Sequence, residues 1–280
     1  MEIRKVSKAD LAFANCTQAE GWISETREDF EIFLDHDPDG CVTAFDHGQR
    51  IGICIATRYD CFGFIGQLIV IPEKRGAGCG RALLSKAIDY LKGFWLQNIY
   101  LDGVPRAISL YKRAGFLEIC LSLRFIGTIN GFSIPPIRNM NPYDLQDVTL
   151  LDRKAFGSDR SNFLMQRFNR YPDLCRVLKV NHRILGFIMG KLRKNLVVAG
   201  LWIVSPEVEH PECLLISLAA GYTGNPISLG VHADNEIAVR LFTKLNLIAR
   251  DNPPTRMGLD QKEHFSYPAM CCAIGPPAKG

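Results

Sequence analysis

The sequence lacks the features that mark several large classes of protein. No apolar run approaches the ~20 residues of a membrane span, so we expect no membrane association. The first residues, MEIRKVSKADL, contain no signal-peptide core, which predicts a cytoplasmic protein. The net charge is only +4, from 33 basic and 29 acidic residues, and there is no Lys/Arg-rich block. We therefore expect no nucleic-acid partner.

Familiar metal and disulfide motifs are missing too. The six histidines show no HxH or HExxH spacing, so the sequence predicts no metal site. The ten cysteines are scattered and form no CxxC pair. Because several of them lie in apolar, strand-like patterns, we expect buried reduced thiols rather than a disulfide framework.

Length and composition favour two globular domains. The chain has 280 residues, of which 47% are hydrophobic and 22% charged. This length is more than one average domain needs, and the balance is typical of proteins with a sizeable buried core.

The most informative stretch runs from Ile69 to Tyr90, IVIPEKRGAGCGRALLSKAIDY. An apolar, β-branched run before Pro72 predicts a buried strand, and the apolar spacing after Gly80 predicts a helix. Glycines at such a junction let the backbone approach a ligand, and the N–H groups of the first helical turn favour an anion. Arg75 adds a fixed positive charge, so the stretch predicts a loop that binds pyrophosphate.

Two common phosphate-binding motifs fit this stretch less well. A P-loop needs GxxxxGK[ST], which is absent. A dinucleotide-binding turn needs GxGxxG, but Arg81 stands at the third glycine and the turn is too long. Asp102, about 20 residues downstream, imitates the ribose-binding acid of that motif, so this interpretation stays open as the weaker one.

Two motifs carry a resemblance to a known family. The pattern R-x-x-G-x-G at residues 75–80, after V-x-P, resembles motif A of the GNAT acetyltransferase superfamily. The pattern A-x-x-L-Y-x-x-x-G-F at residues 107–116 resembles motif B, in the family's order and spacing. Many members carry Asn seven residues before the tyrosine, where this chain has Val104. Residues 101–105 resemble the corresponding segment in a GNAT subgroup whose members carry a second acetyltransferase-like domain.

The resemblance implies an α+β fold, in which helices flank a central, twisted and mostly antiparallel sheet. It implies an N-acetyltransferase that moves the acetyl group of acetyl-CoA directly to a primary amine, without a metal. Tyr111 would be the general acid, and a backbone N–H near Val70 would bind the thioester carbonyl. The residues that the resemblance assigns to acetyl-CoA are Leu68, Ile69, Val70, Arg75, Gly76, Ala77, Gly78, Cys79 and Gly80.

The chain also contains an internal repeat. The pattern I-R-x5-D-L at residues 3–11 recurs at 137–145, an offset of 134 residues. V-x-P-E at residues 70–73 recurs with the same offset, and the centre of motif B recurs with an offset of 131. Anchors in one order at nearly one offset predict two tandem copies of the same fold. We expect a catalytic domain at 1–128, a linker at 129–136 and a second domain at 137–280.

The second copy lacks the residues expected to perform chemistry. Glu209 and Glu212 stand where the first copy has Arg75 and Gly78. A carboxylate at ~4 Å from a phosphate costs about 4 kcal/mol at an effective dielectric constant near 20. Phe242 replaces the tyrosine. The second domain is therefore expected to be non-catalytic and to shape the substrate site or a homodimer contact.

The acceptor is expected to be a small-molecule or peptide amine. Trp22, Asp29 and Asp102 are the candidate substrate-binding residues, and Arg256 is expected on a strand that faces a cleft between the domains. The group that removes the amine proton stays open among Glu20, Glu25, Asp29, Asp102 and a chain of waters.

Two other functions stay open. A protein that binds CoA or acyl-CoA without turnover could keep the same loop for regulation. An acyltransferase with a different acyl donor would need the same loop as well, because the loop contacts phosphates and not the acyl group.

Overall fold

The computed structural model describes residues 1–14, 27–96, 98–259 and 271–274. These residues divide into two compact units. The first unit contains residues 1–119 and 255–259, and the second contains residues 120–254 and 271–274. Each unit has a mixed sheet flanked by helices, as the sequence predicts.

The sheet of the first unit has the strand order β1-β2-β3-β4-β5-β13. Neighbouring strands are antiparallel except β4 and β5, which are parallel. The strands are β1 (Glu2–Lys5), β2 (Cys41–Asp46), β3 (Gln49–Arg58), β4 (Phe62–Val70), β5 (Asn98–Gly103) and β13 (Thr255–Leu259).

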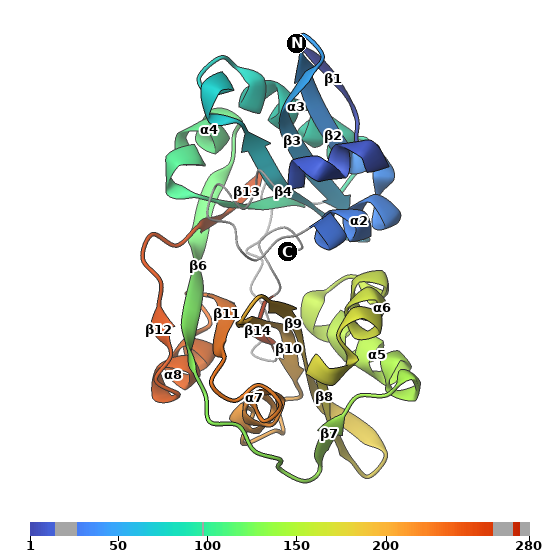
Figure 1. The fold of residues 1–280 in the computed structure, drawn as a ribbon, viewed down its shortest axis with the longest axis vertical. Coiled ribbons are helices and arrows are strands. Elements are labelled where there is room, and N and C mark those ends of the chain that lie inside the picture. The colour runs from blue at the N-terminus through green and yellow to red at the C-terminus, as the bar shows by residue number, and fades with distance from the viewer. Residues whose placement is uncertain (15–26, 97, 260–270, 275–280) are drawn as a thin grey trace. The chain divides into compact units, whose positions relative to one another are not determined.

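The helix after the predicted phosphate loop is the main cover of this sheet. Helix α3 (Cys79–Lys92) packs across β2, β3 and β4 (Figure 1). Leu84, Ala87 and Leu91 recur at helical spacing, and all three are buried in the core of the unit. The other helices are η1 (Lys8–Ala14), α2 (Arg27–His36), η2 (Pro38–Gly40), η3 (Pro72–Lys74), η4 (Pro105–Ala107) and α4 (Ile108–Arg113).

The second unit repeats this topology with the order β7-β8-β9-β10-β11-β6. Only β10 and β11 are parallel among these neighbours. The strands are β6 (Leu117–Thr128), β7 (Ile137–Asn139), β8 (Cys175–Val180), β9 (Arg183–Arg193), β10 (Leu196–Val204) and β11 (Pro226–His232), with β12 (Ile248–Ala249) paired to β6 and β14 (Cys271–Ala273) to β10. The helices are η5 (Pro142–Asp144), α5 (Leu145–Phe156), α6 (Ser161–Arg170), η6 (Pro172–Leu174), α7 (Glu212–Ala219) and α8 (Glu236–Lys244).

Local details of the two units agree with the repeat. Gln67 in β4 and Leu201 in β10 both have positive φ, +50° and +59°, beside a register shift of the strand. They are 134 positions apart, which is the offset found in the sequence. Such bulges increase local twist and bend a strand, so both copies carry the same distortion at the same point.

The last strand of each sheet comes from the other half of the sequence. β13 pairs with β5 in the first unit, with Arg256 opposite Asp102. β6 begins at Leu117 and pairs with β11 in the second unit. The compact units therefore do not coincide with the expected boundaries at residues 128 and 137. Arg256 is buried within the first sheet.

In the part of the chain that the structure describes, no helix is both long and apolar enough to cross a membrane. Among the described residues, free thiols belong to Cys41, Cys54, Cys61, Cys79, Cys175 and Cys213.

Candidate active site

The sheet of the first unit opens between β4 and β5. The two strands pair only from Phe62 and Asn98 to Ile65 and Leu101, while β4 continues to Val70. A cavity of about 800 Å³ lies where they separate. Its walls come from the end of β4, the following loop, the start of α3, the end of β5 and α4.

The bulge in β4 forms one wall of this cavity. Leu68, Ile69 and Val70 follow Gln67 and all line the cavity. β3 occupies one side of this segment, so its other side faces the cavity instead of a neighbouring strand. A strand that separates in this way presents backbone groups to a ligand.

The glycine loop forms the second wall. Gly76 and Gly78 have φ values of +80° and +88°, which residues with a side chain rarely adopt. Gly78 is also the N-cap of α3. A Cβ atom at either glycine would meet nothing within 4 Å, so open space lies in front of the loop. The first-turn N–H groups of α3, a helix of 14 residues, supply the positive end of its dipole.

Positive charge dominates the cavity wall. Arg75, Arg81, Arg106 and Arg113 line it, and Asp102 is the one carboxylate among the lining residues. The Nε of Arg75 donates to the Val70 carbonyl at 3.0 Å, which fixes the arginine beside the loop. Four guanidinium groups around a concave site attract polyanions and offer forked donors to phosphate.

Tyr111 lies on α4 at the inner side of the cavity. Its ring is 6% exposed and meets Phe116 edge-to-face, with centroids 6.2 Å apart. Burial raises the pKa of its hydroxyl above the usual range, so the group stays protonated at neutral pH. A Cβ atom at Gly103 would lie 2.9 Å from the Tyr111 ring, so that glycine lets the ring pack against the end of β5.

Asp102 lines the cavity but is held in an ion pair. The Nε of Arg256 donates to its Oδ1 at 2.6 Å, and the two side chains are 3% and 0% exposed. The guanidinium also lies over the Phe64 ring, 5.0 Å from its centroid. A carboxylate bound to a buried guanidinium is a poor acceptor for a substrate proton, which argues against Asp102 as the general base.

Gln67, whose amide cannot act as a base, also lines the cavity. Its side chain is 2% exposed, and neither amide atom has a hydrogen-bond partner among the described residues. A buried amide without partners costs free energy, and so does positive φ at a residue with a side chain. Only the three-dimensional placement distinguishes this glutamine from an ordinary strand residue.

Two of the predicted site residues that the structure describes, Cys79 and Asp29, do not line the cavity. The Cys79 side chain is buried in the core of the unit beneath α3, and burial raises the pKa of its thiol. Asp29 is buried in the first turn of α2. Trp22, like Glu20 and Glu25, lies outside the described residues. Arg81, Ser109 and Arg113 line the cavity without having been predicted.

In the second unit the same opening is filled by the chain itself. β10 and β11 pair at Val197–Ile227 and Val198–Ser228, and beyond that point β14 pairs with β10 (Figure 1). A bridge from Gly230 to Ile274 attaches this segment to β11 as well.

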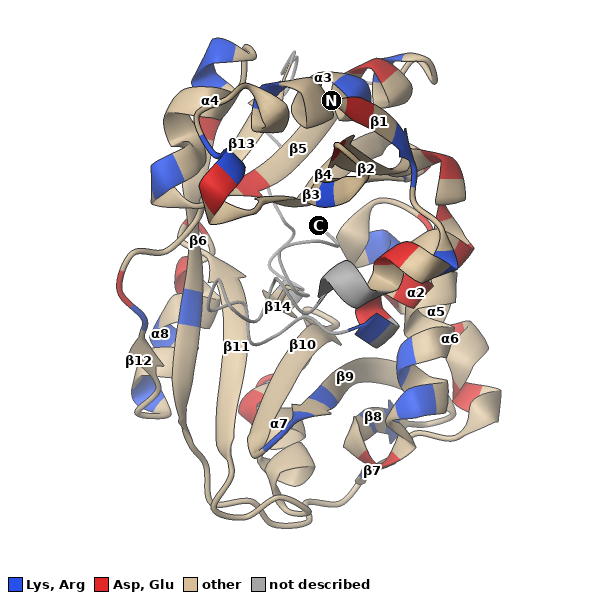
Figure 2. Ribbon diagram, turned by 45° about the horizontal axis from the view of Figure 1, so that its top comes forward, with Lys and Arg blue, Asp and Glu red and all other residues tan. Residues whose placement is uncertain are grey.

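Apolar side chains complete the closure. Trp202 is fully buried and stacks on Phe242, with centroids 6.0 Å apart. β10 and β11 carry no Lys, Arg, Asp or Glu, and they are uncoloured along their length in Figure 2. α7 begins at Glu212 and has Pro211 as its N-cap. The corresponding segment before α3 instead contains Gly76 and the N-cap Gly78, which carry no charge.

Comparisons with known proteins agree with the two units. The profile of the Acetyltransferase (GNAT) family matches residues 10–116, and that of an Acetyltransferase (GNAT) domain matches residues 148–264. Spermidine N(1)-acetyltransferase of Vibrio cholerae is 30% identical over 139 residues, covering 42% of this chain and 79% of that protein.

For two other relatives, the match covers a smaller share of the relative's length. Holothin acyltransferase of a Pseudoalteromonas species is 25% identical over 50% of this chain and 48% of that protein. Mycothiol acetyltransferase of Pseudarthrobacter chlorophenolicus is 34% identical over 33% of each. The chain thus spans about half and a third of these two relatives.

Solved structures share the whole fold. A protein of Pyrococcus horikoshii superposes with a TM-score of 0.81 at 22% identity, covering 100% of this chain and 95% of that one. A tandem GNAT protein from the clavulanic acid biosynthesis pathway gives a TM-score of 0.66 at 13% identity, covering 92% and 97%.

Proposed function

The chain belongs to the GNAT acetyltransferase family, and on that premise we propose that its first unit transfers an acetyl group from acetyl-CoA to a primary amine. The observation that carries this proposal is the cavity between β4 and β5, with the glycine loop and four arginines around it. Acetyl-CoA has a pyrophosphate at one part and a thioester at the other. The loop fits the first, and the separated strand fits the second.

The residues of the cavity would divide the work of the transfer. Acetyl-CoA supplies the thioester, whose acyl carbon the neutral amine attacks. Arg75 and the N–H groups at the start of α3 would hold the pyrophosphate. A backbone N–H near Val70 would stabilise the negative charge that develops on the carbonyl oxygen. Tyr111, kept protonated by burial, would give its proton to the departing thiolate.

The amine loses one proton during this reaction, and we assign that step to water in the cavity. Asp102 is paired with Arg256, and Asp29 does not line the cavity. The acceptor is proposed to be a small-molecule or peptide amine, a class that includes the substrate in the name of the Vibrio cholerae relative.

Calorimetric titration of acetyl-CoA into the full chain tests the binding half of the proposal. We expect one site per chain. Gly78→Glu puts a carboxylate beside the pyrophosphate, and a repulsion of about 4 kcal/mol weakens binding by about three orders of magnitude. Gly48→Glu is the matched control, because Gly48 also has positive φ (+79°) and open space but does not line the cavity.

Two sites per chain would contradict the filled opening of the second unit, and no binding would contradict the proposal as a whole. Release of CoA thiol with a panel of amines then tests turnover. Binding without thiol release from any amine would favour a regulatory acyl-CoA-binding protein.

The acyl donor needs its own test, because the holothin relative is named an acyltransferase. Competition between acetyl-CoA and longer acyl-CoAs for the site measures the preference. We expect acetyl-CoA to compete best, and tighter binding of a longer chain would reassign the donor.

A further inference from the structure

Three potential metal ligands meet at one end of the second sheet. Cys120 is on β6, His232 is the last residue of β11, and Asp234 follows two positions later. β6 and β11 are antiparallel with Ser122 opposite His232, and the Ala233 N–H donates to the Leu121 carbonyl at 2.8 Å. Cys120 is two residues before Ser122 on β6, and Asp234 is two residues after His232, in the turn that follows β11.

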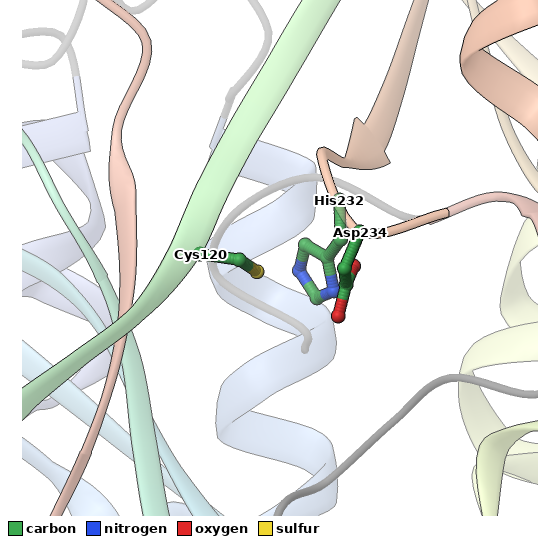
Figure 3. Close-up of side chains that lie close together, drawn as sticks. All are labelled: Cys120, His232 and Asp234. Carbon is green, nitrogen blue, oxygen red and sulfur yellow. The ribbon is translucent and has the colours of Figure 1, made fainter. Parts of the chain in front are cut away.

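The register explains why the three side chains meet. Residues directly opposite in a ladder, and residues two apart on one strand, share a face of the sheet. Figure 3 shows the Cys120 sulfur directed toward the His232 ring, with the Asp234 carboxylate beside it. One ligand atom from each residue lies within 4.8 Å of the others.

The donor set selects the kind of ion. With metal–sulfur and metal–nitrogen bonds of about 2.3 and 2.0 Å, the ligand atoms of a tetrahedral site are roughly 3.3–3.8 Å apart. The observed spread exceeds this by only about 1 Å, which side-chain rotation can remove. Thiolate, imidazole and carboxylate together suit Zn²⁺, and three protein ligands leave one position for water.

Burial and charge support the same assignment. His232 is 3% exposed and so holds its ring in place, Cys120 is half-buried, and Asp234 is open to solvent. A thiolate and a carboxylate balance the two charges of the ion.

We propose that Cys120, His232 and Asp234 form a zinc site that ties β6 to the turn between β11 and α8. All three residues belong to the second unit, and none of them is among the residues that line the cavity of the first unit. Asp234 directly precedes Asn235, whose side chain accepts from the Ala238 N–H and caps α8. The ion would therefore fix the start of α8 as well as the strand pair.

The full chain, stripped with a chelator and desalted, is titrated with Co²⁺ and then with Zn²⁺. We expect one Co²⁺ per chain, with thiolate-to-metal charge-transfer absorption and the visible bands of a tetrahedral site, all displaced by Zn²⁺. Zn²⁺ at a hundred times its dissociation constant should also raise the melting temperature.

Variants identify the ligands. Cys120→Ser should abolish the charge-transfer band, whereas Cys61→Ser, which removes an exposed thiol of the first unit, should leave it unchanged. Asp234→Asn changes an exposed side chain, so it should fold and weaken Zn²⁺ binding at least tenfold. Absence of stoichiometric binding to the wild-type chain would overturn the site. So would binding that persists unchanged in Cys120→Ser and Asp234→Asn.

Discussion

Replacing Arg256 with methionine should destabilise the first unit strongly, because it removes one partner of a buried ion pair. The Arg256–Asp102 pair has a 2.6 Å contact, and its side chains are 3% and 0% exposed. Methionine keeps the length of the stem and much of its packing against Phe64, so the main change is the loss of the guanidinium that pairs with a buried carboxylate. Breaking a buried pair from one side costs about 3–5 kcal/mol. Whole domains have only about 5–15 kcal/mol of stability.

The exposed pair Arg240–Glu236 provides the control. Its side chains are 79% and 71% exposed, although its contact is also 2.6 Å. Arg240→Met should therefore change stability by less than about 1 kcal/mol. The two pairs have the same contact distance, so the comparison isolates burial.

Hydrogen exchange of the β5 amides, followed by mass spectrometry, reports on the first unit alone. This choice avoids treating a protein of two units as a single two-state transition. Arg256→Met should speed exchange in β5 by about 10²-fold or more, since each 1.4 kcal/mol is a factor of ten. Asp102→Asn together with Arg256→Met should recover part of the loss. If Arg256→Met stays within 1 kcal/mol of the control, the buried pair does not stabilise the sheet and the reasoning fails.

Three further predictions concern single side chains. Tyr111→Phe should lower kcat by about 10²-fold, because general acids accelerate reactions by about 10²–10⁴-fold. Acetyl-CoA affinity should stay unchanged, since the buried Phe242 of the second unit shows that the fold accepts a phenylalanine ring at this position. A normal rate would exclude the tyrosine as the acid. Gln67→Leu removes two buried amide atoms without partners, so it should raise the melting temperature and lower turnover, and a lower melting temperature would contradict this account. Burial raises the pKa of Asp144, but hydrogen bonds from Arg138 and the Asn141 N–H, together with the charges of Arg138 and Lys179, lower it overall. The stabilisation is therefore present above the unfolded pKa of about 3.9 and is lost as pH falls through the lower folded value. Asp144→Asn should flatten this acid dependence in urea titrations below about pH 4, and an unchanged slope would count against it.

The local parts of this protein could be predicted from the sequence. The strand, the glycine loop and helix α3 follow from residues that are neighbours in the chain, and so does the placement of Tyr111 on a short helix. The tandem organisation was also predictable, because copied residues keep their offset. Each of these signals depends on spacing within one stretch or on repetition of it.

The remaining features depend on contacts between distant segments. The partner of Asp102 is 154 residues away, and Cys120 is more than a hundred residues from His232. Each half of the chain contains a similar final strand, and strand patterning does not state which sheet that strand joins. Likewise, only the observed strand pairing shows that β14 closes the opening of the second unit. For the same reason, carboxylates such as Asp102 and Asp29 were plausible candidates for the acceptor site until their surroundings were known.

The exchange of final strands has a consequence for synthesis on the ribosome. The first unit is translated first, but its sheet lacks an edge strand until residues 255–259 emerge, about 150 residues after β5. At a synthesis rate of ~5–20 residues per second, roughly 8–30 s pass between the translation of β5 and the translation of its partner strand β13. During that interval the nascent chain presents an unpaired strand, which is a ready template for wrong pairing. A stop codon at position 255 would therefore disable the first unit, although it would leave every residue of the cavity wall in place.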